Sequence, residues 1–555
     1  MAKTKIKQKQ EVTQLTLKYR LAELPSSQHR AGLAGLILVM QWLKRQNAFQ
    51  QKVKDGMICK LLQFDDDGAA IELNQDGVAC LFDEIYAATK EEQRRNQPLK
   101  NKQKEIIPPL REEEYDEVDA KGKTKKKKAY IYPVDVPRGS FLADASFDQS
   151  SDGKNGLWVK LWRDMVWSIL RGVPATRKPF QLRADGLPAD DAVSVWKQLL
   201  KPDDFTVDLP STYFLGAQAY NAENIGFKDR ARFQFLLHFW LFAAQIYVPA
   251  VVDNEGKRNF VGYAIAIPDI ARLEWFCDEL PMLMRDRSPQ PSGYRPREAV
   301  VDLALESALD MMKRLGERLS LASGDQSTAD AVFGIDVIHT EKQGNNVRLL
   351  SMARLDPDDL MNDEYTQIRQ GFWSPLFRRQ CLLNLVNHSP WYEGFDALLC
   401  TLSYERSLKD EYFKRDVRIK LEDMIKETQQ MTDSDPNVSI EPMIFQLVKN
   451  YVNRKLKGKY SLEWEKNWSK LKSDELSAQP GYKDYSDKKT KIAKSAFLDI
   501  RSRTEQEDFI NYFVSTLCSV PQNMKPEAFV ALTQALYQDT EKVRTLTLLA
   551  LSANS

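Results

Sequence analysis

The first regular pattern in the chain is an alternation of apolar and polar residues, which a helical period follows. Residues 12–24 alternate in the manner of a half-buried strand. Pro25 and Ser26 then end the strand, and the apolar residues of 26–46 recur at helical spacing. The opening of the chain therefore predicts a strand followed by a long helix.

Three pairs of short apolar runs, each joined by a polar turn, predict β-hairpins. They are 58–64 with 69–73, 245–252 with 259–268, and 331–339 with 347–355. Helical patterns lie between the second and third pairs, from Asp269 to about Arg287 and from Pro296 to about Leu321. Up to about Pro357 the mixture predicts an α+β region of β-hairpins with packed helices.

From about Asp358 to the end, only helical periods occur. The clearest lies in 441–456, where apolar residues follow the i, i+3, i+4, i+7 and i+8 rule, namely Ile444, Leu447, Val448, Tyr451 and Val452. We therefore predict two domains, an α+β body over 1–357 and an all-α helical bundle over 358–555.

Composition places the chain among ordinary globular proteins and gives no global charge signal. The 555 residues are 43% hydrophobic and 28% charged, with a net charge of +1. A length of this kind favours two or three domains, and any basic surface must be local. Six scattered cysteines without a CxxC pair, together with no signal peptide and no membrane-length apolar run, favour a reduced, cytoplasmic protein.

The segment from Lys90 to Lys128 is densely charged and poor in apolar residues. It holds 13 basic and 9 acidic residues, and it ends in the lysine run KGKTKKKK. This composition predicts a long, charged, mobile insertion that clings to a phosphate backbone. A solvated linker is the alternative.

The bundle contains the strongest local charge. Between Lys449 and Arg503 there are 15 basic and 7 acidic residues, with tyrosines and tryptophans interleaved. Cationic grooves with stacking rings suit single-stranded nucleic acid, whereas a solvated basic face is the alternative. The candidate strand-binding residues are Arg454, Lys455, Lys457, Lys459, Lys488, Lys491 and Lys494.

A loop rich in amides and cations precedes the second hairpin. Its candidate residues for base edges and phosphates are Asn221, Asn224, Lys228, Arg230 and Arg232, and a solvated surface loop is the alternative. His29 and Arg30 begin the long helix beside Ala31, Gly32, Ala34 and Gly35. These small residues let another backbone or a phosphate approach closely, so the pair is a candidate phosphate contact or part of a tight helix packing.

No catalytic, metal or cofactor motif is visible. The four histidines lie far apart, and none forms an HD, HxH or HExxH pattern. The triplet GKT at 122–124 lacks the first glycine and the preceding strand of a phosphate loop. The acidic runs 65–68 and 356–359 are the best candidates for a noncontiguous carboxylate site, although both look like turns or helix starts.

Several segments together resemble a known family. LGAQAYNAEN, LLHFW, YVP and VGYAIAIPD within 212–269, then YRPREAVVDLALESAL (294–309), are similar to the large subunit of type I CRISPR Cascade complexes. ELPSSQHRAGLAGLILVMQWL (23–43) resembles the N-terminal signature of the subtype I-B and Myxan-like branch.

The resemblance implies a non-catalytic subunit of an RNA-guided antiviral complex. Such a subunit sits beside the 5′ handle of the CRISPR RNA, which His29 and Arg30 would contact, and it recognises the protospacer-adjacent motif in duplex DNA. It then helps unwinding and R-loop formation, while the C-terminal bundle, like the small subunit, guides the displaced strand. The alternatives are a metal-dependent nuclease and a protein-only scaffold.

The resemblance also implies partners. They are the CRISPR RNA, target DNA and the backbone, handle-binding and small subunits, and then either a helicase-nuclease or a transposition adaptor. Internal methionines such as Met431 precede the basic helices, so an internal start would release a separate small subunit. The bases of the motif and the choice between degradation and transposition are not written in the sequence.

Overall fold

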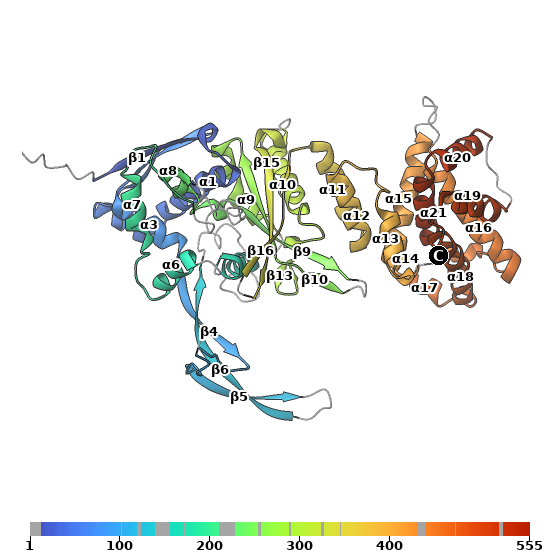
Figure 1. The fold of residues 1–555 in the computed structure, drawn as a ribbon, viewed down its shortest axis with the longest axis horizontal. Coiled ribbons are helices and arrows are strands. Elements are labelled where there is room, and N and C mark those ends of the chain that lie inside the picture. The colour runs from blue at the N-terminus through green and yellow to red at the C-terminus, as the bar shows by residue number, and fades with distance from the viewer. Residues whose placement is uncertain are drawn as a thin grey trace, which may run out of the picture. The chain divides into compact units, whose positions relative to one another are not determined.

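The computed structural model divides the chain into two compact units (Figure 1). The first comprises residues 1–249 and 260–359, and the second comprises 250–259 and 360–555. The residues described are 13–101, 103–118, 124–138, 156–170, 174–209, 228–253, 257–287, 290–323, 327–344, 346–430, 439–471, 473–520 and 526–555.

A small antiparallel sheet begins the first unit, as the alternation at the start of the chain predicts. Its strand order is β1-β3-β2, formed by β1 (Leu15–Arg20), β2 (Cys59–Asp65) and β3 (Gly68–Leu73). The short η1 (Leu21–Glu23) follows β1 and precedes the long helix α1 (Ser27–Lys44). Two further helices, α2 (Asn47–Lys54) and α3 (Gln75–Ile85), flank β2 and β3 in the sequence.

The core of the first unit is a larger sheet in the order β10-β9-β11-β15-β16, with β14 pairing parallel to β9. The strands are β9 (Gln245–Val252), β10 (Arg258–Phe260), β11 (Tyr263–Ile270), β14 (Val300–Val301), β15 (Val332–Gln343) and β16 (Asn346–Leu355). The second and third predicted hairpins, 245–252 with 259–268 and 331–339 with 347–355, are present in this sheet. Every residue of β11 is buried. Helices α1 and α10 (Glu306–Ser323) pack on these strands, and α9 (Leu273–Arg285) packs against both of these helices.

Two predicted helix starts were wrong. The helix expected from Asp269 begins at Leu273, because β11 continues to Ile270. The helix expected from Pro296 begins at Glu306. The residues before it form β12 (Pro291–Ser292), β13 (Arg295–Pro296), η4 (Arg297–Ala299) and β14.

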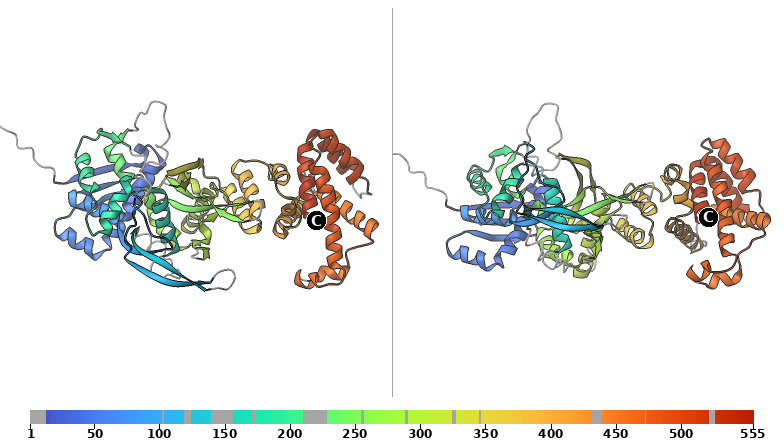
Figure 2. Two further views of the ribbon diagram at one scale, coloured as in Figure 1. Left: turned by 60° about the horizontal axis from the view of Figure 1, so that its bottom comes forward. Right: turned by 90° about the horizontal axis from the view of Figure 1, so that it is seen from below.

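The charged segment 90–128, predicted as a mobile insertion, contains β-strands that its composition did not predict. Residues 90–95, 111–118 and 124–128 belong to a three-stranded antiparallel sheet in the order β4-β6-β5, which Figures 1 and 2 show as a long ribbon. The strands are β4 (Ala88–Arg95), β5 (Arg111–Val118) and β6 (Thr124–Pro137). We call this sheet the arm. Cross-strand pairing supplies the order that the low apolar content does not.

Short elements complete the first unit. The aromatic stripe at 158–170 forms α5 (Leu157–Met165) and the π-helical η2 (Val166–Leu170), with Trp158 and Trp162 buried. The others are α6 (Pro174–Ala184), α7 (Asp191–Leu199), β7 (Thr206–Asp208), β8 (Lys228–Arg230), α8 (Ala231–Leu236), η3 (Trp240–Phe242) and η5 (Thr328–Asp330).

The second unit is helical apart from the strand residues of 250–259, as predicted for the end of the chain. Its helices are α11 (Asp359–Gly371), α12 (Pro375–Val386), α13 (Phe395–Thr401), α14 (Tyr404–Leu408), α15 (Glu411–Gln430), α16 (Glu441–Tyr460), η6 (Lys466–Lys470), α17 (Ser473–Ser477), α18 (Tyr482–Arg501), α19 (Gln506–Tyr512), η7 (Phe513–Leu517), α20 (Pro526–Gln538) and α21 (Thr540–Ala553). Helix α21 is buried from Val543 to Ala553 and packs against α15, α16 and α18. The prediction of an α+β region followed by a helical bundle is confirmed. None of the described helices is long and apolar enough to cross a membrane.

Candidate nucleic-acid interface

We call the candidate residues that precede the central sheet, Asn221, Asn224, Lys228, Arg230 and Arg232, the rim. Two of its predicted cations are exposed to solvent. Lys228 and Arg230 are exposed on strand β8, which pairs with β7. Because side chains alternate along a strand, Asp229 between them points the other way and bonds His29 Nε2 at 2.7 Å. The two cations therefore share one side of a short strand whose other side is anchored in the protein.

Arg232 is held inside this rim. Its guanidinium lies 3.6 Å from the carboxylates of Glu23 and Asp203, and it stacks 5.0 Å from the centroid of Phe233. The hydroxyl of Tyr19 donates to its backbone oxygen at 2.9 Å. Arg232 therefore holds the rim in place, and its charge faces these two carboxylates. Asn221 and Asn224 lie outside the described residues.

His29 and Arg30 are also committed to internal contacts. His29 is buried between Ser26 and Asp229, and Arg30 pairs with Asp269 and donates to the Leu21 carbonyl at 3.1 Å. These contacts favour tight packing over the predicted phosphate contact.

The small residues beside this pair serve a backbone approach. A side chain placed at Gly32 or Gly35 would collide with the carbonyl groups of Leu236 and Phe239, respectively. The close approach that the glycines predict is therefore to another stretch of protein backbone.

The arm pairs its lysine run with acids. In the register of β5 and β6, Glu114 lies opposite Lys128, Asp116 opposite Lys126 and Glu117 opposite Lys125. Lys128 also bonds Glu112 at 3.0 Å. Cross-strand neutralisation of this kind weakens the predicted grip of the lysines on a phosphate backbone.

In the second unit, the predicted strand-binding cations lie on the last turns of α16 and the middle of α18. Arg454, Lys455, Lys457 and Lys459 are exposed along the last turns of α16, although Lys457 pairs with Glu463. On α18, Lys491 is exposed, and the Lys488 ammonium lies 5.2 Å from the ring centroid of Tyr460 at the end of α16. Lys494 sits 3.9 Å from the ring centroid of Tyr404. Lys459 and Lys488, which are distant in sequence, thereby meet at the ring of Tyr460.

The interleaved aromatic residues are less available than the sequence suggests. Trp464, Trp468, Tyr482 and Tyr485 form one ring cluster with centroid separations from 5.4 to 6.5 Å. Trp468, Tyr485 and Tyr451 are buried, whereas Trp464 is 45% exposed. Most of these rings therefore belong to the core, and Trp464 remains the best candidate for stacking a base.

A cationic cluster that the sequence did not single out links α15, α16 and α18. Lys414, Arg418 and Lys449 surround Lys489 closely enough to act on its charge. Burial, with repulsion from these three neighbours, lowers the pKa of Lys489 to about 8, and Glu411 opposes this effect. We call these four residues the bundle cluster. Such a group is stabilised when an anion enters it.

The bundle cluster could not be seen in the sequence because its members come from separate helices. Lys449 and Lys489 belong to the basic stretch, but Lys414 and Arg418 lie among the acids of α15. Arg418 also donates to the Ala553 carbonyl at 2.9 Å, near the end of α21, which fixes its position. Periodicity along α15 places Lys414 and Arg418 on one face, and this is the only signal that pairs them.

The carboxylates considered for a nuclease have structural partners. Asp65 accepts the backbone N–H groups of Asp67 and Gly68 in the β2–β3 turn. Asp66 accepts from Arg272 at 2.8 Å, and Asp359 accepts the Thr328 N–H at 3.4 Å. Within the described ranges, no group of three His, Cys, Asp or Glu side chains is arranged to hold a metal ion.

Two family models match consecutive parts of the chain. The type I-B CRISPR Cas8b N-terminal domain matches residues 58–325, and the Cas8b C-terminal domain matches 332–554. The chain belongs to the Cas8b family. This confirms the predicted type I-B large subunit, and the family implies membership of a CRISPR Cascade complex. No curated protein matches this Cas8b by sequence.

The two family models do not divide Cas8b where its compact units divide. The C-terminal model begins at 332, so it includes β15 and β16, which complete the central sheet of the first unit. The first unit ends at Asp359.

Proposed function

We propose that this Cas8b recognises target DNA for its complex without cutting it. Exposed cations of the first unit test the protospacer-adjacent motif in duplex DNA, which helps unwinding and R-loop formation. The second unit then guides the displaced strand. The observation that carries the proposal is the concentration of exposed cations on α16 and α18 in a chain whose net charge is only +1.

The displaced strand is the occupant that best matches the second unit. Lysines exposed in rows attract a phosphate backbone without reading its sequence, and Trp464 offers a ring face to an unpaired base. A duplex presents no unpaired base faces along its length. The second unit therefore suits a single strand produced by unwinding.

The test is the salt dependence of binding to a single-stranded DNA. Replacing Lys455, Lys459, Lys491 and Arg454 by Gln removes four exposed cations while keeping side chains of similar length. We expect the slope of log affinity against log salt to fall by about three, since each neutralised phosphate contributes about 0.7 for single strands.

The matched control replaces Lys409 and Lys426, two exposed lysines that pair with Glu405 and Asp423 in the same unit. The control protein should bind as the parent does. Binding of the parent protein that does not change with salt would instead support a protein-only scaffold and overturn the proposal.

A second experiment tests the rim. In the assembled complex, Lys228→Ala with Arg230→Ala should reduce the preference for motif-bearing duplex over a duplex with a scrambled motif. A good contact to a base contributes about 1–3 kcal/mol of discrimination. The control replaces Lys60 and Arg348, which are exposed on other strands of the first unit.

The same variants can be extended to Asn221, Asn224 and Arg232. An unchanged preference after all five substitutions would remove the rim from motif reading. Loss of motif preference on replacing Asn221 and Asn224 alone would assign the base contacts to the amides, and loss with Lys228 and Arg230 alone would assign them to the cations.

The partners follow from the same proposal. They are a CRISPR RNA, the Cascade backbone, handle-binding and small subunits, and either a helicase-nuclease or a transposition adaptor. Co-expression with neighbouring genes, followed by identification of the co-purified RNA and proteins, tests this set. A Cas8b that co-purifies with no RNA would contradict it.

A further inference from the structure

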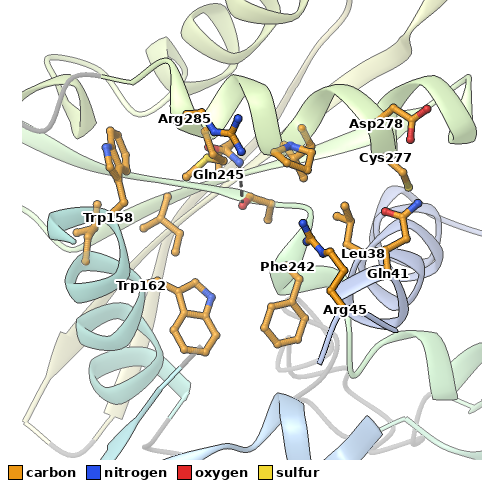
Figure 3. Close-up of a pocket in the computed structure, with 16 residues that line it drawn as sticks. Leu38, Gln41, Arg45, Trp158, Trp162, Phe242, Gln245, Cys277, Asp278 and Arg285 are labelled. Carbon is orange, nitrogen blue, oxygen red and sulfur yellow. Dashed lines mark hydrogen bonds between the residues drawn. The ribbon is translucent and has the colours of Figure 1, made fainter. Parts of the chain in front are cut away.

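The first unit contains a cavity that none of the contacts above uses. Its volume is about 260 Å³, and it is lined by α1, α5, α9 and the chain around the start of β9 (Figure 3). This is below the ~300–1,000 Å³ typical of sites for drug-sized ligands. The cavity therefore suits a single ring system and not a whole nucleotide.

The walls are mostly apolar and include the rings of Trp158, Trp162 and Phe242. Trp162 and Phe242 are stacked, with their ring centroids 5.8 Å apart and their planes 25° apart. Leu38, Leu280 and Met284 complete the lining from the two other helices. Rings and thioethers of this kind favour a flat, polarisable occupant.

Buried polar atoms of two side chains that face each other across the lining, Trp162 and Gln245, lack hydrogen-bond partners among the described residues. They are Nε1 of Trp162, which is a donor, and Oε1 of Gln245, which is an acceptor. Trp162 is 4% exposed and Gln245 is 3% exposed. Native proteins seldom leave such groups unpaired, so each one is a place where a ligand gains a bond.

The side chain of Gln245 is weakly restrained. Among the residues that the structure describes, the amide of Gln245 is held only by a long bond from its Nε2 to the Ala244 carbonyl, at 3.4 Å. Figure 3 shows Trp162 and Gln245 on different walls of the cavity, with Arg45 and Phe242 on the remaining side. A flat ligand between the walls can therefore accept from one and donate to the other.

The mouth of the cavity is positive. Arg45 and Arg285 are exposed and line it together with the single carboxylate of Asp278. Arg45 also lies 5.6 Å from the ring centroid of Trp42, which holds its stem beside the cavity. Two guanidinium groups at the entrance of an apolar cavity suit an apolar ring that carries a phosphate outside.

We propose that this cavity takes one unpaired nucleobase of a single strand, with a neighbouring phosphate held at Arg45 and Arg285. The inference rests on the proposed function only in assuming that nucleic acid is the partner. An aromatic side chain of another protein fits less well. A base edge offers a donor and an acceptor together, phenylalanine offers neither, and a side chain carries no phosphate for the mouth.

The test compares strands with and without bases. The full chain is titrated with a short single-stranded DNA, an RNA of the same sequence, and versions of both whose bases are absent. Trp162→Phe removes the N–H but keeps a ring, and Gln245→Leu removes the amide but keeps the volume. Trp196→Phe is the control, because Trp196 is equally buried on α7 but does not line the cavity.

We expect the parent protein to prefer the base-bearing strand at least about fivefold, as a stacked base typically contributes. In both cavity variants the preference for the base-bearing strand should be two- to tenfold smaller. A thermodynamic cycle that compares the parent and each variant on strands with and without bases isolates this loss. The control should keep it. A larger loss with RNA identifies the guide as the source of the base, and a larger loss with DNA identifies the displaced strand.

Thermal unfolding checks that each variant is folded. Folded cavity variants that retain the full preference overturn the inference while leaving the proposed function intact. Variants that instead release a co-purified protein subunit, with the preference unchanged, also overturn it in favour of a side-chain pocket. Failure of the proposed function itself gives a different result, namely no salt-dependent binding of any strand.

Discussion

At the scale of single residues, Lys489 connects the electrostatics of the bundle to a measurable pH dependence. Burial and the charges of Lys414, Arg418 and Lys449 lower its pKa from 10.5 to about 8, with Glu411 as the opposing acid. The folded protein therefore releases this proton at a lower pH than the unfolded chain does. Between about pH 8 and 10.5 the unfolded chain binds more protons, so this site makes stability rise with pH.

Replacing Lys489 by Met should consequently stabilise the protein at pH 7. We expect a gain of about 2 kcal/mol, which is less than the full pKa shift implies because the side chain is partly open to solvent. The gain should shrink as the pH rises from 8 towards 10.5. Urea unfolding at pH 7 and pH 9.5 measures it, and Lys483→Met on the exposed face of α18 is the control. An equal gain at both pH values would contradict the assignment.

Gly32 gives a second prediction at this scale. Alanine is usually the better helix former by about 1 kcal/mol, yet at Gly32 its Cβ would collide with the Leu236 backbone. We expect Gly32→Ala to destabilise the first unit by about 2 kcal/mol or more. Gly458, inside α16, meets no atom within 4 Å, so Gly458→Ala should be neutral or stabilising. Thermal unfolding compares the two, and equal effects would show that the contact at α1 is not tight.

At the scale of elements, local patterns predicted the hairpins and the bundle well, and the errors have identifiable physical causes. Strands β9, β11, β15 and β16 carry their apolar residues and turns within a few positions, so they are visible in the sequence. The start of α10 was misplaced because Val300 and Val301 pair with β9, a contact between distant segments. The arm was missed because its order depends on pairing between stretches that lie apart in the sequence, β4 with β6 and β5 with β6.

The candidate site was less predictable than the fold for the same reason. Lys228 and Arg230 are exposed. Arg232, however, lies beside the carboxylates of Glu23 and Asp203, and His29 is bonded to Asp229. Residue type and spacing do not reveal whether a cation is already neutralised. The bundle cluster likewise needs three helices to pack before its charges meet.

The arm supports a prediction about masked charge. Replacing Glu114 and Asp116 by Gln removes the acids opposite Lys128 and Lys126. We expect non-specific affinity for duplex DNA to increase several-fold at low salt and to return to the parent value at high salt, since the exposed lysines act through screened attraction. Gel-shift titration at two salt concentrations measures this. Glu72→Gln with Asp76→Gln, away from the lysine run, is the control, and no increase would show that the lysines are not held in check by their partners.

At the scale of the whole molecule, the bundle bears on whether an internal start can release a small subunit. A product starting at Met431 lacks α15, whose Phe413, Val417 and Leu421 are buried in the second unit. It also loses the bond from Arg418 to the Ala553 carbonyl near the end of α21. Removing a helix that packs on both α16 and α21 exposes an apolar face on each of them.

We therefore predict that residues 360–555 fold by themselves, whereas residues 431–555 do not. Each large apolar side chain lost from a core lowers the free energy of unfolding by about 2–5 kcal/mol. Losing the three buried side chains of α15 therefore removes most of the stability of a typical domain. Circular dichroism and thermal unfolding of the two fragments check this.

The longer fragment carrying Val417→Asp serves as the control, because it keeps α15 but breaks the same face. If residues 431–555 unfold as cooperatively as the longer fragment, α15 is dispensable and an internal start at Met431 becomes physically reasonable. If they do not, a small subunit made from this gene would need α15 from another chain to complete its core.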